Sequence, residues 1–251
     1  MRIKHHKEIE FFFKRFFFSE KFLLKRRLER AVKKNYEPEI KLIEEFVVSG
    51  TDSLDIGAYQ GIYSYVISKY AKTVHTFEPN PVIFSFLNRN IYKIINNIKL
   101  YNFGLSNKDG KTILRIPIRN KLAKEENYEE FFEMGRATIH NKNVFDEFRT
   151  FEVNVKKLDN LQFENPISFI KIDVEGHETE VIEGGIKTIN KNKPILLVEI
   201  EERHSKRKVI DVIKFINSLG YKSYYLNEKE LVSTATLTNF DTFNNYIFKP
   251  T

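Results

Sequence analysis

From residue 53 onward, the hydrophobic positions of the chain alternate between short apolar runs and longer amphipathic segments. The apolar runs, rich in Ile, Val, Leu and Phe, predict strands at residues 53–56, 73–77, 98–103, 167–174, 195–200, 221–226 and 246–249. The amphipathic segments predict helices at residues 63–70, 82–95, 178–190 and 206–219. Strands separated by helices imply parallel pairing through crossover connections. We therefore expect a doubly wound α/β fold with a mostly parallel, seven-stranded sheet.

The first 50 residues carry a different pattern, dominated by aromatic and basic side chains. Phenylalanine occupies positions 11–13 and 16–18, and a basic cluster follows at 25–27. At about 100° per residue, three consecutive rings cover more than half of a helix circumference, so such a helix has no single apolar face. Two interpretations stay open. The rings pack on the main domain or on a second subunit of a homo-oligomer, or residues 11–34 dock substrate or contact the membrane surface.

These two patterns predict the domain organisation. We expect a helical N-terminal arm over residues 1–50, with its second helix at 39–48, followed by a single domain over residues 51–251. A polar stretch at residues 119–150 interrupts the alternation of strands and helices, and we expect it to form a cap over the substrate.

Composition and charge limit the possible chemistry. Apolar residues make up 41% of the chain and charged residues 30%, as in globular proteins. The absence of cysteine excludes disulfide scaffolds, zinc ribbons and thiolate nucleophiles. Of the net charge of +7, the arm supplies +5, from 13 basic and 8 acidic residues, so the remaining residues supply only +2. No spanning segment or signal peptide is visible, which makes a cytoplasmic location the default expectation, with peripheral membrane contact through the arm as an addition.

A glycine-containing turn after the first predicted strand is the first candidate site. Gly57 and Gly61 stand there, but Tyr59 replaces the middle glycine of the dinucleotide-binding pattern. Asp55 is poorly placed beside a pyrophosphate, whereas it can receive an ammonium group directly or through water. Glu78 ends the next strand 21 residues after Gly57, at the spacing of an acid that accepts hydrogen bonds from ribose hydroxyls. Together these residues predict a nucleoside that carries an amino acid, as S-adenosylmethionine does.

Four blocks of the sequence resemble the FkbM family of S-adenosylmethionine-dependent methyltransferases. They are Leu54 to Gly61, Phe77 to Pro81, Gly104 to Asn107 and Ile170 to Glu178. The last block, with its Lys-Ile-Asp-Val-Glu-Gly run, is the most discriminating of the four. Tyr59 departs from the usual pattern, where asparagine is common, and so does His177, where a small residue is frequent.

The resemblance implies a Rossmann-like class I methyltransferase fold whose last strand is antiparallel. It also implies transfer of a methyl group to a hydroxyl, often on a sugar, a glycan or a small metabolite. The residues expected at the cofactor are those of the first two blocks and the end of the fourth strand: Asp55, Gly57, Ala58, Tyr59, Gly61, Glu78, Pro79, Asn80 and Asp173.

Acidic side chains gather after the fourth and fifth predicted strands, where we expect the methyl acceptor. The candidate catalytic residues are Asp173, Glu175, His177, Glu199 and His204. Glu178 is either a further site residue or only the start of a helix, which favours acids. His177 is either a general base or an exposed loop histidine. These carboxylates and His204 serve as hydrogen-bond acceptors, or alternatively bind a divalent cation such as Mg²⁺ or Mn²⁺, which we do not favour.

Within the predicted cap, Arg136 and Thr138 are candidate substrate contacts, and an ordinary solvated loop is the alternative for both. Two other functions are weaker alternatives. The basic arm would suit an RNA-directed methyltransferase, although the sequence after the fourth strand lacks the Asp/Asn-Pro-Pro-Tyr type of run that nucleic-acid amine methylation commonly uses. The second alternative is a binding protein that has the cofactor-binding fold but does not catalyse methyl transfer.

Overall fold

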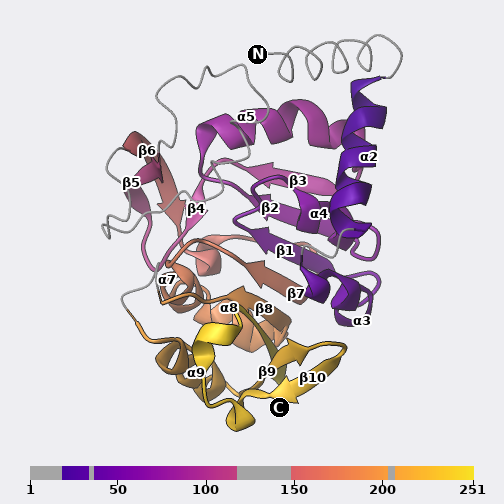
Figure 1. Cartoon of the computed structure of the whole chain (residues 1–251). Helices are drawn as coiled ribbons and strands as arrows, with labels where there is room; N and C mark the ends of the chain where they lie inside the picture. The colour runs from indigo at the N-terminus through magenta and orange to yellow at the C-terminus, as the bar shows by residue number, and fades with distance from the viewer. Residues whose placement is uncertain (1–18, 34–36, 118–147, 203–206) are drawn as a thin grey trace, which may run out of the picture.

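The computed structural model describes residues 19–33, 37–117, 148–202 and 207–251, and an eight-stranded sheet forms its centre (Figure 1). The strand order is β10-β9-β11-β8-β7-β1-β2-β3. In chain order the strands are β1 (Asp52–Ile56), β2 (Thr73–Phe77), β3 (Ile98–Tyr101), β7 (Ile167–Ile172), β8 (Ile195–Glu199), β9 (Tyr221–Asn227), β10 (Glu230–Ser233) and β11 (Asn245–Pro250). Five adjacent strands of the sheet, β8, β7, β1, β2 and β3, pair in parallel. The strand β11 pairs antiparallel with both β8 and β9.

The predicted doubly wound fold is therefore confirmed, and so is the antiparallel last strand that the resemblance implied. All seven predicted strands belong to the main sheet. The eighth, β10, forms a hairpin with β9 and was not predicted.

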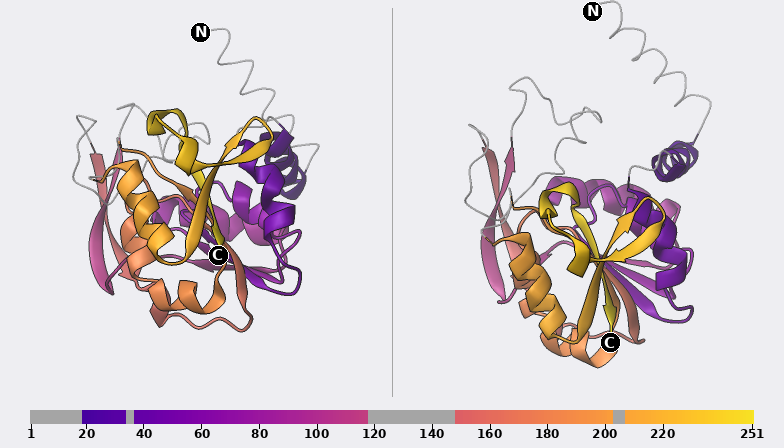
Figure 2. Two further views of the ribbon diagram at one scale, coloured as in Figure 1. Left: turned by 90° about the horizontal axis from the view of Figure 1, so that it is seen from below. Right: turned by 60° about the horizontal axis from the view of Figure 1, so that its bottom comes forward.

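Helices cover both faces of this sheet (Figures 1 and 2). One face packs on α2 (Glu20–Lys33), α3 (Ile43–Phe46), α4 (Ile62–Ile67) and α5 (Pro81–Asn90), and the other on α7 (Glu178–Glu183), α8 (Ile186–Asn192) and α9 (Val209–Ser218). Side chains alternate between the faces along each strand. Phe169 of β7 belongs to the apolar core on the α4 side, whereas its neighbour Ile170 belongs to the core on the α9 side. By the same alternation, Lys171 is on the α4 side.

Two predicted helices differ in the structure. The segment 178–190 is divided into α7 and α8 at Gly184 and Gly185. A Cβ atom on Gly184 would lie 2.0 Å from the Ser106 carbonyl oxygen, so this break brings another loop close to the backbone. The segment 39–48 is a 3-10 turn, Pro38–Leu42, that runs into the short α3.

A second, three-stranded sheet lies beside the main one, with the order β4-β6-β5 (Figure 2). Its strands are β4 (Gly104–Leu105), β5 (Gly110–Pro117) and β6 (Phe148–Lys156), and β5 pairs antiparallel with β6 over its full length. The end of the predicted polar cap, residues 148–150, is thus part of a strand. Residues 118–147, with Arg136 and Thr138, lie outside the described residues.

The N-terminal helix α2 packs on the main domain. Its Leu28 is buried in the same apolar core as Ile43 and Phe46, while Phe22 is 43% exposed. The phenylalanines at 11–18 lie outside the described residues. Among the helices that the structure describes, none has the length and apolar character that crossing a membrane requires.

Candidate functional site

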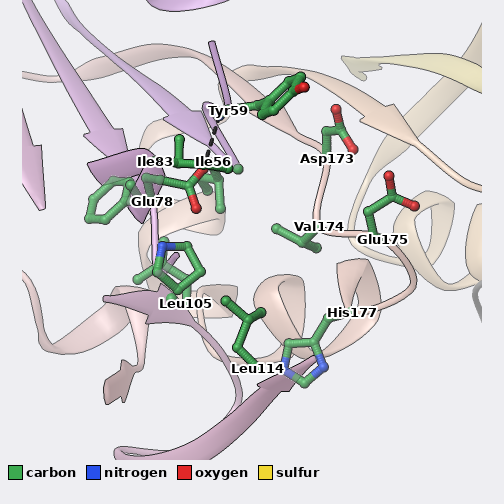
Figure 3. A pocket seen from close by; sticks show the side chains of 14 residues that line it. Ile56, Tyr59, Glu78, Ile83, Leu105, Leu114, Asp173, Val174, Glu175 and His177 are labelled. Carbon is green, nitrogen blue, oxygen red and sulfur yellow. Dashed lines mark hydrogen bonds between the residues drawn. The ribbon is translucent and has the colours of Figure 1, made fainter. Parts of the chain in front are cut away.

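A cavity of about 670 Å³, open to solvent, lies at the carboxyl ends of β1, β2 and β7 (Figure 3). This is where open parallel sheets bind their ligands. Figure 3 shows Glu78 on one side of the cavity and Asp173 and Glu175 on the other. Tyr59 and His177 add polar groups, and the remaining walls are largely apolar, formed by Ile56, Phe77, Pro79, Ile83, Leu105, Leu114 and Val174.

Gly57 holds the loop after β1 against the loop after β7. Its φ angle is +84°, in the left-handed region, and a Cβ atom there would lie 1.7 Å from the Asp173 carbonyl oxygen. The Asp173 N–H in turn donates to the Ile56 carbonyl at 2.9 Å. Glycine at this position is therefore required by contact with the protein's own backbone. Gly61, with a φ angle of +74°, precedes the first turn of α4.

Glu78 connects the first two loops. Its Oε2 accepts the Tyr59 N–H at 2.9 Å, and its Oε1 accepts the Asn80 N–H at 2.8 Å. Tyr59 adopts a left-handed φ of +45°, unusual for a residue with a side chain. Burial raises the pKa of Glu78 to about 7, although the hydrogen bonds from these two backbone N–H groups lower it. Glu78 is thus a buried acid that shapes the loops and also lines the cavity.

Three further predicted cofactor residues have different positions. Pro79 lines the cavity. Asn80 is fully buried and caps α5, because its Oδ1 accepts the Val82 N–H at 3.0 Å. Ala58 is 7% exposed, and its N–H donates to the Phe77 carbonyl at 3.2 Å. Ala58 and Asn80 therefore support the loops from behind the cavity wall.

Asp55 is fully buried on the α4 side of the sheet and is not part of the cavity wall. Its Oδ2 accepts the Ser64 hydroxyl at 2.5 Å, while Oδ1 is buried without a hydrogen-bond partner. Burial raises its pKa, and the positive charge of Lys171 and the Ser64 hydroxyl oppose this shift. Side chains alternate along β1, so the Ile56 side chain faces the cavity and the side chain of its neighbour Asp55 faces the other side of the sheet. The expected direct contact with a ligand ammonium group is not available in this arrangement.

A small acidic cleft of about 160 Å³ adjoins the cavity and shares Asp173 and Glu175 with it. Its other lining residues are Gly176, Glu178, Glu199 and Glu201. The structure therefore brings together three predicted catalytic residues, Asp173, Glu175 and Glu199. Among the described residues, no three such side chains are arranged to hold a metal ion, and His204 lies outside them.

The loop between β7 and α7 is held in an unusual conformation. Glu175 and Gly176 both have left-handed φ angles, of +52° and +98°. Glu178 is 3% exposed, and its Oε1 accepts the Gly176 N–H at 2.9 Å, so it organises this loop as well as beginning α7. Burial raises the pKa of Glu178 to about 7. Burial and the nearby charge of Asp173 also raise the pKa of Glu199 well above its ordinary value, which favours its protonated form.

His177 lines the cavity but is 9% exposed, so the interpretation as an exposed loop histidine is wrong. Its Nε2 lies 2.9 Å from the Ser106 hydroxyl, and its Nδ1 lies 3.7 Å from Glu180. His177 therefore joins the loop after β7 to the loop after β4. Ser106 is 71 positions away in sequence, and no local pattern pointed to this contact.

Sequence analysis also missed Lys171, whose Nζ lies 2.7 Å from Asp173 Oδ2. Its signal was a charged residue inside an otherwise apolar strand. Tyr63 was missed too: its ring lies below the Lys171 ammonium, 4.7 Å from Nζ to the ring centroid.

Comparisons with known proteins identify the family. The Methyltransferase FkbM domain matches residues 55–223, about two thirds of the chain. No curated protein matches. The chain is similar in structure to a methyltransferase FkbM from Methylobacillus flagellatus KT, with 15% identity and a TM-score of 0.45 over 79% of this chain. It spans only 43% of that protein's length.

Two other solved structures show comparable similarity. One is an rRNA methylase from Streptococcus thermophilus, with 10% identity, a TM-score of 0.46, and coverage of 85% of this chain and 94% of that one. The other is a TehB-like SAM-dependent methyltransferase from Corynebacterium glutamicum, with 10% identity, a TM-score of 0.44, and coverage of 92% and 98%. The family assignment rests on the domain match, which covers more than half of the sequence. The chain belongs to the FkbM methyltransferase family.

Proposed function

We propose that this protein transfers a methyl group from S-adenosylmethionine to a hydroxyl oxygen of a sugar, a glycan or a small metabolite. The observation that carries the proposal is Glu78, a buried acid at the end of β2 that lines the cavity beside the glycine-containing loop. Membership of a methyltransferase family supplies the reaction class.

The chemistry of the cavity fits this cofactor. Each Glu78 oxygen accepts one backbone N–H, and a carboxylate oxygen can accept a second hydrogen bond, which matches the two ribose hydroxyls. The apolar wall, with Ile83 and Leu105, suits the adenine ring. Asp173 and Glu175 complement the positive charges of the sulfonium and the ammonium group.

When bound, S-adenosylmethionine supplies an electrophilic methyl group, so the protein has mainly to position the acceptor oxygen and remove its proton. Asp173 and Glu175 line both the cavity and the acidic cleft. We assign them to orient the acceptor hydroxyl and to take its proton. Glu199, whose pKa is raised, donates a hydrogen bond to the acceptor from the cleft. His177 holds the cavity wall through Ser106.

Calorimetric titration of the full chain with S-adenosylhomocysteine tests cofactor binding. We expect saturable binding, and we expect Glu78→Ala to weaken it by about 10- to 100-fold, the value of one or two lost hydrogen bonds to a charged group. Glu230→Ala, at an exposed position of β10, is the matched control and should bind as the wild type does. Absence of binding to the wild type, or equal binding by the Glu78 variant, would contradict the proposal.

A second experiment addresses the acceptor. The protein is incubated with methyl-labelled S-adenosylmethionine and fractionated cell extract, and the labelled product is tested for stability to base. Ethers formed on hydroxyl groups survive this treatment, whereas methyl esters are hydrolysed. Label that is released by base would refute transfer to a hydroxyl, and label found in nucleic acid would refute a free sugar, a glycan or a small metabolite as the acceptor.

A further inference from the structure

Lys171 is a buried cation at the centre of the sheet. It lies in β7, and its side chain is only 4% exposed. Among the described residues that are buried, no other lysine or arginine is present. A buried ammonium group is unfavourable unless nearby charges and hydrogen bonds compensate for the water it has lost. The groups around Lys171 therefore explain why it is there.

Four carboxyl groups from four parts of the chain act electrostatically on this ammonium. Asp173 follows it in the chain and pairs with it at 2.7 Å. Asp55 is its neighbour across the β1–β7 pairing, and Glu199 ends the adjacent strand β8. Glu37, in the segment before α3, adds a further negative charge near the ammonium. Their combined negative charge raises the pKa of Lys171 above its ordinary value, in spite of burial.

An aromatic ring also contacts the ammonium. The Tyr63 ring lies 4.7 Å from Nζ, within the range of a cation–π contact. Tyr63 is 5% exposed, and its hydroxyl donates to Glu37 Oε2 at 2.5 Å. The contacts thus run from Glu37 through Tyr63 and Lys171 to Asp173. Glu37 lies outside residues 55–223, so the family match assigns it no role.

We propose that Lys171 is a positioning residue for the methyl-transfer site: it holds the Asp173 carboxylate in place, and Tyr63 and Glu37 hold Lys171, with Glu37 contributing from outside the residues that match the family domain. The proposal rests on the proposed function, because it requires that Asp173 faces the cofactor and the acceptor. Of these four carboxyl groups, Asp173 is the one that pairs with the ammonium directly, at 2.7 Å.

The test measures binding of S-adenosylhomocysteine to the full chain as a function of pH, by calorimetry. In Lys171→Met, the neighbouring carboxyl groups lose a positive charge that favours their ionised form, so affinity should reach its plateau at a higher pH than in the wild type. At pH values below that plateau the variant should bind more weakly than the wild type, and raising the pH should restore its affinity. A purely structural role would lower the affinity at every pH and would not move the plateau.

Two further variants complete the design. Lys214→Met makes the same substitution at an exposed position of α9 and should leave the pH profile unchanged. Tyr63→Phe keeps the ring but loses the hydrogen bond to Glu37, so affinity should fall about threefold with the plateau in its original place. If Tyr63→Phe binds as the wild type does, the role of Glu37 is refuted.

The outcomes separate the two proposals. If the wild type does not bind S-adenosylhomocysteine, the proposed function fails. If the wild type binds and Lys171→Met has the same pH profile, the role of Lys171 fails. Should circular dichroism show that Lys171→Met does not fold, Lys171→Arg replaces it. The larger guanidinium keeps the charge but not the position, so we expect lower affinity with an unmoved plateau, and unchanged affinity would overturn the proposal.

Discussion

Replacement of Gly57 by alanine should disrupt both stability and the candidate site, and Gly50 offers a matched control. The two glycines have nearly the same left-handed φ, +84° and +83°. A Cβ atom on Gly50 would have no atom within 4 Å, whereas one on Gly57 would lie 1.7 Å from the Asp173 carbonyl oxygen. The pair therefore separates the cost of the backbone conformation from the cost of the close contact.

The conformational cost is common to both variants, about 1–2 kcal/mol for an L-residue in the left-handed region. Gly57→Ala also requires the new Cβ and the Asp173 oxygen to move apart by about 1.3 Å to reach the 3.0 Å limit of real contacts. Such a movement breaks the hydrogen bond from the Asp173 N–H to the Ile56 carbonyl, which adds about 1–3 kcal/mol. We expect totals of about 1–2 kcal/mol for Gly50→Ala and 2–5 kcal/mol for Gly57→Ala.

Urea unfolding followed by circular dichroism measures both free energies. Calorimetry with S-adenosylhomocysteine then shows whether the residual folded Gly57→Ala protein has lost binding, as displacement of Asp173 predicts. Equal destabilisation by the two substitutions would refute the argument, because it would mean that the two loops separate without cost. Unchanged binding would show that Asp173 does not depend on this contact.

Three other substitutions test the interior. Ser64→Ala removes the hydroxyl that donates to buried Asp55, so the free energy of unfolding should fall by about 1–3 kcal/mol, and less than about 0.5 kcal/mol in urea unfolding would contradict this. Ser218→Ala, at an exposed position, is its control. Gly184→Ala places a Cβ atom 2.0 Å from the Ser106 carbonyl, and this overpacking should cost about 1–3 kcal/mol; a neutral or stabilising effect in the same assay would oppose it. Burial lowers the pKa of His75 below 6.5, so its neutral form stabilises the fold above pH 6.5 and this contribution is lost as the pH falls through the lowered value. His75→Gln should remove that part of the pH dependence of the urea midpoint, and parallel profiles of variant and wild type would show that His75 does not contribute.

Sequence analysis located the parallel strands because each is a local apolar run with a clear boundary. The predicted site lies at the carboxyl ends of β1, β2 and β7, an edge that follows from the topology, and the structure has a cavity there. The strand β5 was not predicted, because Lys111, Thr112 and Arg115 interrupt its apolar residues and its partner β6 begins at Phe148, far along the chain. Pairing between distant segments leaves no mark on a local pattern.

The candidate site shows the same limit at the level of single residues. Asp55 was expected beside a ligand, but the alternation of β1 turns it toward Ser64 on the opposite side. Gly57 was expected at the cofactor; it lines the cavity, and contact with the Asp173 backbone also requires a glycine at this position. Lys171 was visible as a charge in an apolar strand, yet its meaning depends on Tyr63 and Asp55, which come from other elements.

The position of β11 has a consequence for the order of folding. This strand follows β9 and β10 in the chain but lies between β8 and β9 in the sheet. The β9–β10 hairpin consequently has no place to attach until residues 245–250 have left the ribosome. The five parallel strands β1, β2, β3, β7 and β8 can pair earlier during synthesis. Each of them joins a neighbouring strand that has already been synthesised. The strands whose carboxyl ends border the cavity can thus assemble first, and the carboxyl-terminal strands complete the sheet in a single late step.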